Sequence, residues 1–132
     1  MEKAILTFEQ PALLFSALGH PVRLAMLEIL SEGEACVCHL QAGLRIRQAY
    51  ASQHLNILRQ AGLLNSRKEG TRVYYELASP DLEGIIDQAK MLLIAMGRLS
   101  PEELEPVFDL SHSECGCPQC QELHRSERIT QP

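Results

Sequence analysis

The sequence predicts a mainly α-helical domain with one small β-hairpin, in the α-α-α-α-β-β-α order of a winged helix-turn-helix. Apolar residues recur at steps of three and four in four segments before residue 62, which indicates four helices. Two alternating segments then flank Glu69-Gly70, and a proline-led apolar segment starts near residue 80. We therefore expect the winged domain over residues 1–98. A short helix and a cysteine-bearing tail are expected over residues 99–132.

The first two predicted helices span Phe8 to Leu18 and Val22 to Leu30. Gly19-His20-Pro21 separates them, and Pro21 suits the first turn of a helix because no amide donor is needed there. The second of these helices is apolar almost all round, as expected of a central core helix. Arg23 on this helix is expected to pair with an acid or a phosphate, and we favour a structural pairing.

Residues 35–64 predict a short helix, a tight turn, a second helix and the start of a strand. In the second helix, Ala51, Leu55, Leu58 and either Ala61 or Leu63 form a buried stripe. The opposite face carries hydrogen-bonding side chains of the kind that read base edges and phosphates: Gln48, Tyr50, Ser52, Gln53, His54, Asn56 and Arg59. We therefore predict a DNA-reading helix supported by a first helix that begins with Cys36 and Cys38.

The predicted hairpin pairs residues 63–68 with residues 71–77. Gly70 supplies the positive φ that a tight hairpin turn needs. Three basic side chains surround this turn: Arg67, Lys68 and Arg72. A basic hairpin directly after a reading helix is typical of a wing that lies along the DNA backbone or in the minor groove.

A long helix is predicted from Ser79, as N-cap, and Pro80 to about Gly97. Its wide apolar stripe lies far from the basic residues, so we expect it to form a homodimer surface together with the first helix. A purely intramolecular core is the alternative. Ser100-Pro101 repeats the helix-start signal, with Glu103 completing a capping box.

The distribution of charge favours nucleic acid as a partner, although the net charge of the 132-residue chain is −5. Residues 45–72 carry six basic residues and one acid, whereas both flanking regions are acidic. Positive charge is thus concentrated on the predicted reading helix and wing, where phosphate binding requires it. A face that is basic by chance is the alternative.

Several protein classes are disfavoured by the sequence. No apolar run approaches the ~20 residues of a membrane helix, and the N-terminus does not resemble a signal peptide. We therefore expect a cytoplasmic protein without a membrane partner, in which five cysteines serve as metal ligands or redox thiols. The five histidines are scattered without a nucleophile–base spacing, so we expect neither an enzyme nor a small organic substrate.

Two groups of cysteines are candidate metal ligands. Cys36 and Cys38 are two residues apart, which is about 200° on a helix, so both can reach one ion only if the backbone there is extended or unwound. The tail carries Cys115, Cys117 and Cys120 in a C-x-C-x2-C spacing. Thiolates select As(III), Cd(II), Pb(II), Zn(II) or Cu(I) over hard ions. Whether the two groups form one site or two, within or between subunits, stays open, and buried or redox cysteines are the alternative.

Four stretches together resemble the ArsR/SmtB family of metal-responsive repressors: Leu18-Gly19-His20-Pro21-Val22-Arg23-Leu24, Ser52-Gln53-His54-Leu55, Leu58-Arg59-Gln60-Ala61-Gly62-Leu63-Leu64 and Gly70-Thr71-Arg72-Val73-Tyr74-Tyr75. The resemblance implies a dimeric winged helix-turn-helix protein that leaves its double-stranded operator when an inducer binds. Cys36-Val37-Cys38 matches the family's cysteine pair at the start of the third helix, found in arsenic, cadmium and lead sensors.

The chain departs from the family pattern at several positions. His39 replaces the usual acid after the second cysteine, and Arg47 replaces a turn residue that is often Ser. The family's zinc site on the last long helix would correspond to Ser79, Asp81, Leu92 and Ala95, of which only Asp81 can bind metal.

These observations lead to three hypotheses. The first is a repressor released from its operator by a thiophilic metal or metalloid, namely As(III), Cd(II) or Pb(II), with Zn(II) as a further candidate. The second keeps the fold but makes the signal oxidative, with Cys38 and a tail cysteine forming a disulfide or polysulfide. The third is a metal-buffering or carrier protein that does not read DNA.

Overall fold

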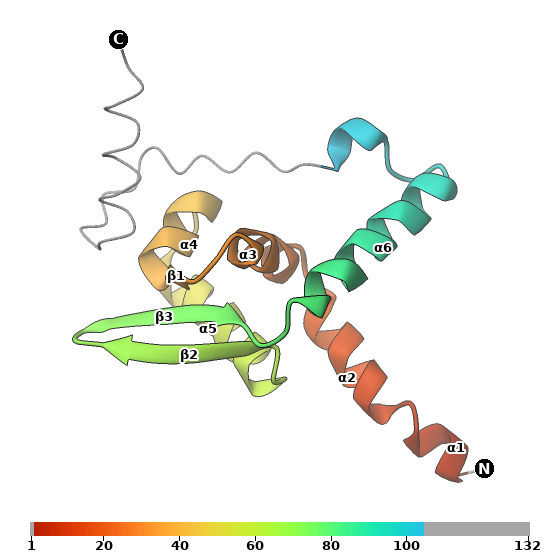
Figure 1. Ribbon diagram of the computed structural model, residues 1–132, viewed down its shortest axis with the longest axis horizontal. Coiled ribbons are helices and arrows are strands. Elements are labelled where there is room, and N and C mark those ends of the chain that lie inside the picture. The colour runs from red at the N-terminus through yellow and green to blue at the C-terminus, as the bar shows by residue number, and fades with distance from the viewer. Residues whose placement is uncertain (1, 105–132) are drawn as a thin grey trace.

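The computed structural model describes residues 2–104, and its elements follow the predicted order with two additions. The elements are α1 (Glu2–Leu6), α2 (Glu9–Leu18), α3 (Pro21–Ser31), β1 (Ala35–Cys36), α4 (Val37–Leu44), α5 (Gln48–Gln60), β2 (Leu64–Glu69), β3 (Arg72–Leu77), α6 (Asp81–Ala95) and a 3-10 turn (Pro101–Glu103). In Figure 1 the β2–β3 hairpin projects from one side of the central helices, and α2 and α6 project from the other. The predicted winged helix-turn-helix, mainly helical with a small hairpin, is confirmed.

The sheet has three strands rather than the two that the sequence predicts. Strand β1 pairs antiparallel with β3, which gives the order β1-β3-β2. Cys36 therefore lies in a strand, and the helix expected to begin at the cysteines begins one residue later, at Val37. A strand of two residues is too short to show an alternating pattern, so periodicity could not reveal it. Helix α1 is the second addition.

The core is built around α3, which contacts α2, α4, α5, α6 and β3. Pro21 occupies its first turn, and the His20 imidazole caps it by accepting a hydrogen bond from the Val22 amide over 3.1 Å. The largest fully buried aliphatic side chains come from three helices: Met26, Leu27, Leu40, Leu55 and Leu58. This packing fixes the two helices of the helix-turn-helix against the central helix.

Helix α6 belongs to the core in its first half only. Leu82 and Ile86 are buried, and Lys90 forms an ion pair with Glu28 of α3. With the exception of Tyr50, the large exposed apolar side chains among the described residues lie in residues 5–15 and 91–96: Ile5, Leu6, Phe8, Leu13, Phe15, Met91, Leu92, Leu93 and Met96. The predicted stripe on this helix is thus divided between the core and an exposed surface.

The helix starts that the sequence predicts are present, with one shift. The Ser79 hydroxyl accepts a hydrogen bond from the Asp81 amide over 3.2 Å, although Pro80 is the residue that precedes the first helical position. The carboxylate of Glu103 accepts a hydrogen bond from the Ser100 amide over 2.8 Å, as the capping box requires. The boundary predicted at residue 98 remains a prediction, because residues 105–132 lie outside the described part.

No single helix among residues 2–104 is long and apolar enough to cross a membrane. Only the combination of Lys3–Leu18 with Pro21–Ser31 reaches that length and composition, across a bend of 90°.

Candidate DNA-binding surface and thiol site

Helix α5 presents a polar face to solvent. Its apolar stripe of Ala51, Leu55 and Leu58 is fully buried, as the spacing predicts. Six residues of the predicted reading face are exposed: Gln48, Tyr50, Ser52, Gln53, Asn56 and Arg59. The Arg59 guanidinium donates to the Asn56 side-chain oxygen over 2.9 Å, so these two groups orient each other in the free protein. The structure therefore gathers most of the predicted reading residues on one accessible face.

His54 does not belong to that face, which corrects the sequence prediction. Its side chain is only 5% exposed and is one of the buried side chains of α5. The spacing already contained this signal, because His54 is three residues after Ala51 and four before Leu58, within the buried stripe. The His54 imidazole therefore contributes to packing in the free protein rather than to a DNA-facing surface.

Arg23 and two aromatic side chains surround His54. The Arg23 guanidinium lies 3.2 Å from His54 Nδ1, and it donates to the carbonyls of Ala17 over 2.6 Å and Ser16 over 3.2 Å at the end of α2. The rings of His20 and Tyr50 lie 4.3 and 4.6 Å from the His54 ring. Burial, and then the charges of His20 and Arg23, lower the pKa of His54. Arg23 thus has a structural role, as predicted, but its partners are backbone carbonyls and His54 rather than an acid, and it connects α2, α3 and α5.

The turn between α4 and α5 is formed by residues that are unusual for it. Arg45 ends α4 in the left-handed region, with φ of 54°. Arg47 precedes α5 in an extended conformation, and its side chain makes no capping hydrogen bond. The departure noted at Arg47 therefore removes the usual cap of the reading helix, and the core contacts of α3, α4 and α5 fix the turn instead.

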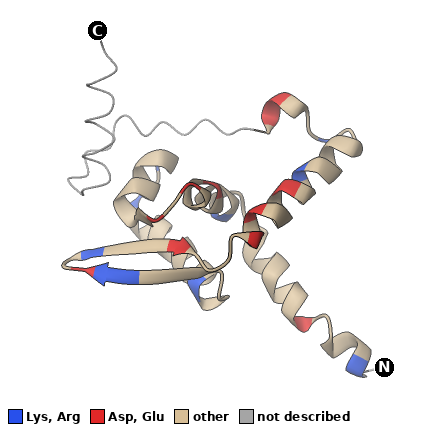
Figure 2. Ribbon diagram, in the orientation of Figure 1, with Lys and Arg blue, Asp and Glu red and all other residues tan. Residues whose placement is uncertain are grey.

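The wing forms as predicted, and it carries basic side chains near its tip. Gly70 adopts φ of 62° between β2 and β3. Lys68 is exposed and Arg72 is half-buried. Figure 2 shows basic residues along the hairpin with some acidic ones among them, whereas the charged residues on α6 and the turn after it are mostly acidic. The separation of charge expected from the sequence is therefore also a separation in space.

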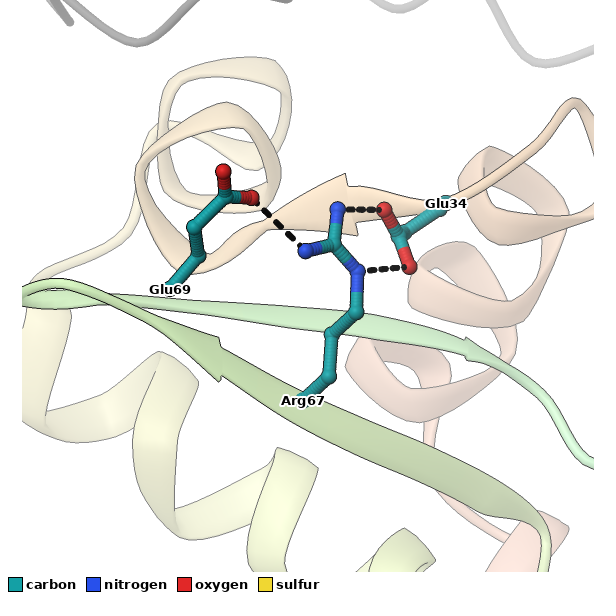
Figure 3. Close-up of polar contacts among 3 residues, drawn as sticks. All are labelled: Glu34, Arg67 and Glu69. Carbon is teal, nitrogen blue, oxygen red and sulfur yellow. Dashed lines mark hydrogen bonds and ion pairs between the residues drawn. The ribbon is translucent and has the colours of Figure 1, made fainter.

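Arg67, the third basic residue of the wing, is engaged within the protein. Its Nε and one terminal nitrogen donate to the two carboxylate oxygens of Glu34 over 2.8 and 2.6 Å. Its other terminal nitrogen donates to Glu69 over 2.7 Å (Figure 3). The Arg67 guanidinium carbon also lies 4.5 Å from the centre of the Tyr74 ring. The hydrogen bonds that Arg67 donates to Glu34 and Glu69 raise its pKa further above the ordinary value. Arg67 is exposed, but a DNA phosphate would have to compete with these carboxylates for it.

The two cysteines at the start of α4 lie together. Cys36 has an extended backbone, with φ of −81° and ψ of 162°, whereas Cys38 lies in the first turn of the helix. The structure joins their sulfur atoms in a disulfide, with the Cα atoms 5.4 Å apart. The condition derived from the sequence, an extended backbone at one cysteine, is therefore met.

The surroundings of this cysteine pair are partly apolar. Cys36 is 2% exposed and packs with Tyr74, and Cys38 is half-buried beside them. Burial lowers the pKa of the neighbouring His39, which favours its neutral form. Two sulfurs at one place suit part of the coordination shell of a soft ion. Within residues 2–104, no group of three His, Cys, Asp or Glu side chains is placed to hold a metal. Cys115, Cys117 and Cys120 lie outside the described residues.

Two contributors to this region escape analysis of the sequence. Glu34 carries no motif, and its partner Arg67 is 33 residues away. Tyr74 lies in the strand that the sequence predicts, but its contact with Cys36 depends on the additional strand β1. No spacing rule could have identified either of them.

The chain is similar to known regulators of transcription. The family model described as "Bacterial regulatory protein, arsR family" matches residues 20–66. The arsenical resistance operon repressor of Escherichia coli is 43% identical over 89 residues, which cover 64% of this chain and 75% of that protein. The cadmium resistance transcriptional regulatory protein CadC homolog of Staphylococcus aureus is 37% identical over 79 residues, covering 59% and 65% of the two chains.

A solved structure supports the same assignment. The homodimeric winged helix-turn-helix DNA-binding domain of Mb0332 from Mycobacterium bovis, described as a possible ArsR-family regulator, superposes with a TM-score of 0.64. It is 27% identical and covers 73% of this chain and 89% of that domain. These relatives are DNA-binding regulators of transcription and not enzymes. From its sequence matches, its fold and its polar helix α5, this chain belongs to the ArsR family of winged helix-turn-helix transcriptional repressors.

Proposed function

We propose that this repressor binds double-stranded operator DNA as a homodimer and is released when a thiophilic metal or metalloid binds Cys36 and Cys38. The single observation that carries the proposal is the extended backbone at Cys36, which brings two sulfurs together at the start of α4. Helix α4 packs directly on α5. A change of geometry at the sulfurs is therefore transmitted by a short route to the reading helix.

The DNA surface of the proposal combines α5 and the wing. Gln48, Tyr50, Ser52, Gln53 and Arg59 are exposed on α5, where amide groups suit recognition of base edges. Lys68 and Arg72 of the wing, with Arg67 when its carboxylate partners release it, supply charge for phosphates.

The dimer surface of the proposal is the exposed apolar set on α1, α2 and α6. Phe8 is 67% exposed, and the other large side chains of this set are between 37% and 64% exposed. An apolar surface of this kind on a single protomer marks an interaction site. The similarity to a homodimeric domain favours a second copy as its partner.

The proposed inducers are ions that prefer thiolates: As(III), Cd(II) or Pb(II), with Zn(II) as a further candidate. Relatives named for arsenical and cadmium resistance favour this class of ion. As(III) prefers three sulfurs, so Cys36 and Cys38 require a further ligand, which we assign to Cys115, Cys117 or Cys120 of the same or the partner subunit. Protonated thiols bind such ions poorly, so the proposal also implies a reducing cytoplasm and thiolate at the moment of binding.

A second candidate function is oxidative sensing, and the disulfide favours it. Two thiols at Cys36 and Cys38 would lose two electrons and two protons to a peroxide or a polysulfide, and the sulfur–sulfur bond would form. The pairing differs from the one expected from the sequence, which joins Cys38 to a tail cysteine. This function uses the same connection between α4 and α5.

The experiment is fluorescence anisotropy on DNA from upstream of the protein's own operon, with reduced full-length protein. As(III), Cd(II) or Pb(II) should release the DNA, while thiolate charge-transfer bands report the number of sulfurs bound. Cys36→Ser and Cys38→Ser should keep DNA binding and lose the release. Release by peroxide alone would favour the oxidative function. Absence of operator binding, with several ions bound per chain, would instead indicate a metal-buffering protein.

A further inference from the structure

One face of the small sheet connects the cysteine pair to the wing. Cys36 of β1 is opposite Tyr74 of β3, and Tyr74 is opposite Arg67 of β2. Directly opposed residues in antiparallel strands place their side chains on the same face. Tyr74 is buried against Cys36, with Cys38 beside them, and the Arg67 guanidinium covers its ring. A continuous row of contacts therefore runs from the sulfurs to the wing.

Glu34 provides a second connection between the cysteine pair and the wing. It precedes Cys36 by two residues, at the entry to β1, and both of its carboxylate oxygens accept hydrogen bonds from Arg67 (Figure 3). These hydrogen bonds lower the pKa of the Glu34 carboxyl, so it is ionised at neutral pH. A displacement of β1 at Cys36 must therefore displace the carboxylate that holds Arg67.

The contact of Arg67 with Glu34 excludes the same contact with a DNA phosphate. Its Nε and one terminal nitrogen form the two-pronged edge that binds a carboxylate or a phosphate in the same way. Glu34 occupies that edge, and Glu69 occupies the remaining terminal nitrogen. This arrangement coexists with sulfurs that are joined at Cys36 and Cys38. Arg67 cannot present the same edge to a DNA phosphate while Glu34 holds it.

We propose that Glu34 is a positioning residue that couples the thiol site to the wing. When Cys36 and Cys38 are drawn together, β1 presents Glu34 to Arg67, and the wing loses one phosphate contact. When the thiols are apart, Glu34 is displaced and Arg67 binds the DNA backbone. This inference rests on the proposed function, and it adds a route through the wing to the route through α5.

The test compares Glu34→Gln with Glu69→Gln in the reduced full-length protein. Each variant removes one negative charge and one carboxylate partner of Arg67, but Glu69 lies in the hairpin and has no direct connection to β1. Operator affinity is measured with and without Cd(II), and the ratio of the two affinities is the readout. An exposed ion pair has a modest effect. We therefore expect Glu34→Gln to reduce the ratio about threefold and Glu69→Gln to leave it unchanged.

Each outcome of this test is distinguishable. Equal ratios in the two variants would overturn the coupling role of Glu34. A common reduction would show that only loss of charge matters, and two unchanged ratios would show that neither carboxylate takes part. Loss of the Cd(II)–thiolate band in Glu34→Gln would make Glu34 a metal ligand and would also overturn it. If Cd(II) binds the wild-type thiols and does not alter its DNA affinity, the proposed function fails, and the coupling fails with it.

Discussion

Two arginines hold this protein together in different ways. Arg23 is partly buried and binds two backbone carbonyls and His54, which ties α2 and α3 to α5. Arg67 is 51% exposed and binds two carboxylates at the edge of the wing. The partners of Arg23 are fixed by helix ends and a buried ring, whereas those of Arg67 are side chains that water and phosphate can replace. The Arg23 guanidinium therefore stabilises the fold, whereas the Arg67 guanidinium can exchange its partners, as the proposed coupling through Glu34 requires.

The largest expected effect concerns Arg23. Arg23→Ala removes the side-chain donor to the Ala17 carbonyl and the partner of the buried His54 Nδ1, while the Ser16 carbonyl keeps the Gly19 amide as a donor. We therefore expect the free energy of unfolding to fall by about 2–4 kcal/mol. Arg67→Ala is the matched comparison and should cost less than about 1 kcal/mol, since exposed ion pairs stabilise little. Urea denaturation measures both. Similar losses in the two variants would remove the distinction between them.

The next prediction compares the contributions of α5 and the wing to DNA binding. Gln53→Ala should change sequence preference, with about 1–3 kcal/mol of discrimination lost at one base pair. Arg72→Ala should weaken binding to all sequences alike and reduce the salt dependence by about one phosphate contact. Anisotropy titrations on operator and scrambled DNA at several salt concentrations measure both effects. A uniform loss in Gln53→Ala would contradict base reading by that residue.

The smallest expected effect is the pH dependence of stability that arises from His54, the buried partner of Arg23. Burial lowers the pKa of His54 in the folded protein, so the unfolded chain binds a proton first as the pH falls through the ordinary histidine value. Stability should therefore be constant above about pH 7 and should decrease below it, by at most about 1.4 kcal/mol per pH unit for each such histidine. His39, whose pKa burial also lowers, contributes in the same direction.

The control for this pH dependence is a pair of substitutions. His54→Gln and His39→Gln should each remove part of the slope measured by urea denaturation between pH 7.5 and 5.5. An unchanged slope in His54→Gln would mean that folding does not change the pKa of His54, and it would contradict the lowering of that pKa by burial.

Much of the fold could be predicted because its signals are local. Proline at the start of α3, the three-and-four spacing of α5, and Gly70 between two alternating segments each act within a few residues. The site was harder to predict where it depends on distant partners. The third strand has only two residues, and the contact of Glu34 with Arg67 spans 33 positions. His54 is the exception, because its spacing indicated burial while its chemistry suggested DNA.

The apolar surface on α1, α2 and α6 has a consequence for regulation in the cell. If two copies must assemble before the operator is occupied, occupancy at low abundance rises roughly with the square of the amount of chain, because assembly follows mass action. A modest increase in synthesis or degradation then produces a disproportionate change in transcription. Side chains remote from both the sulfurs and the DNA would therefore determine how sharply the operon responds.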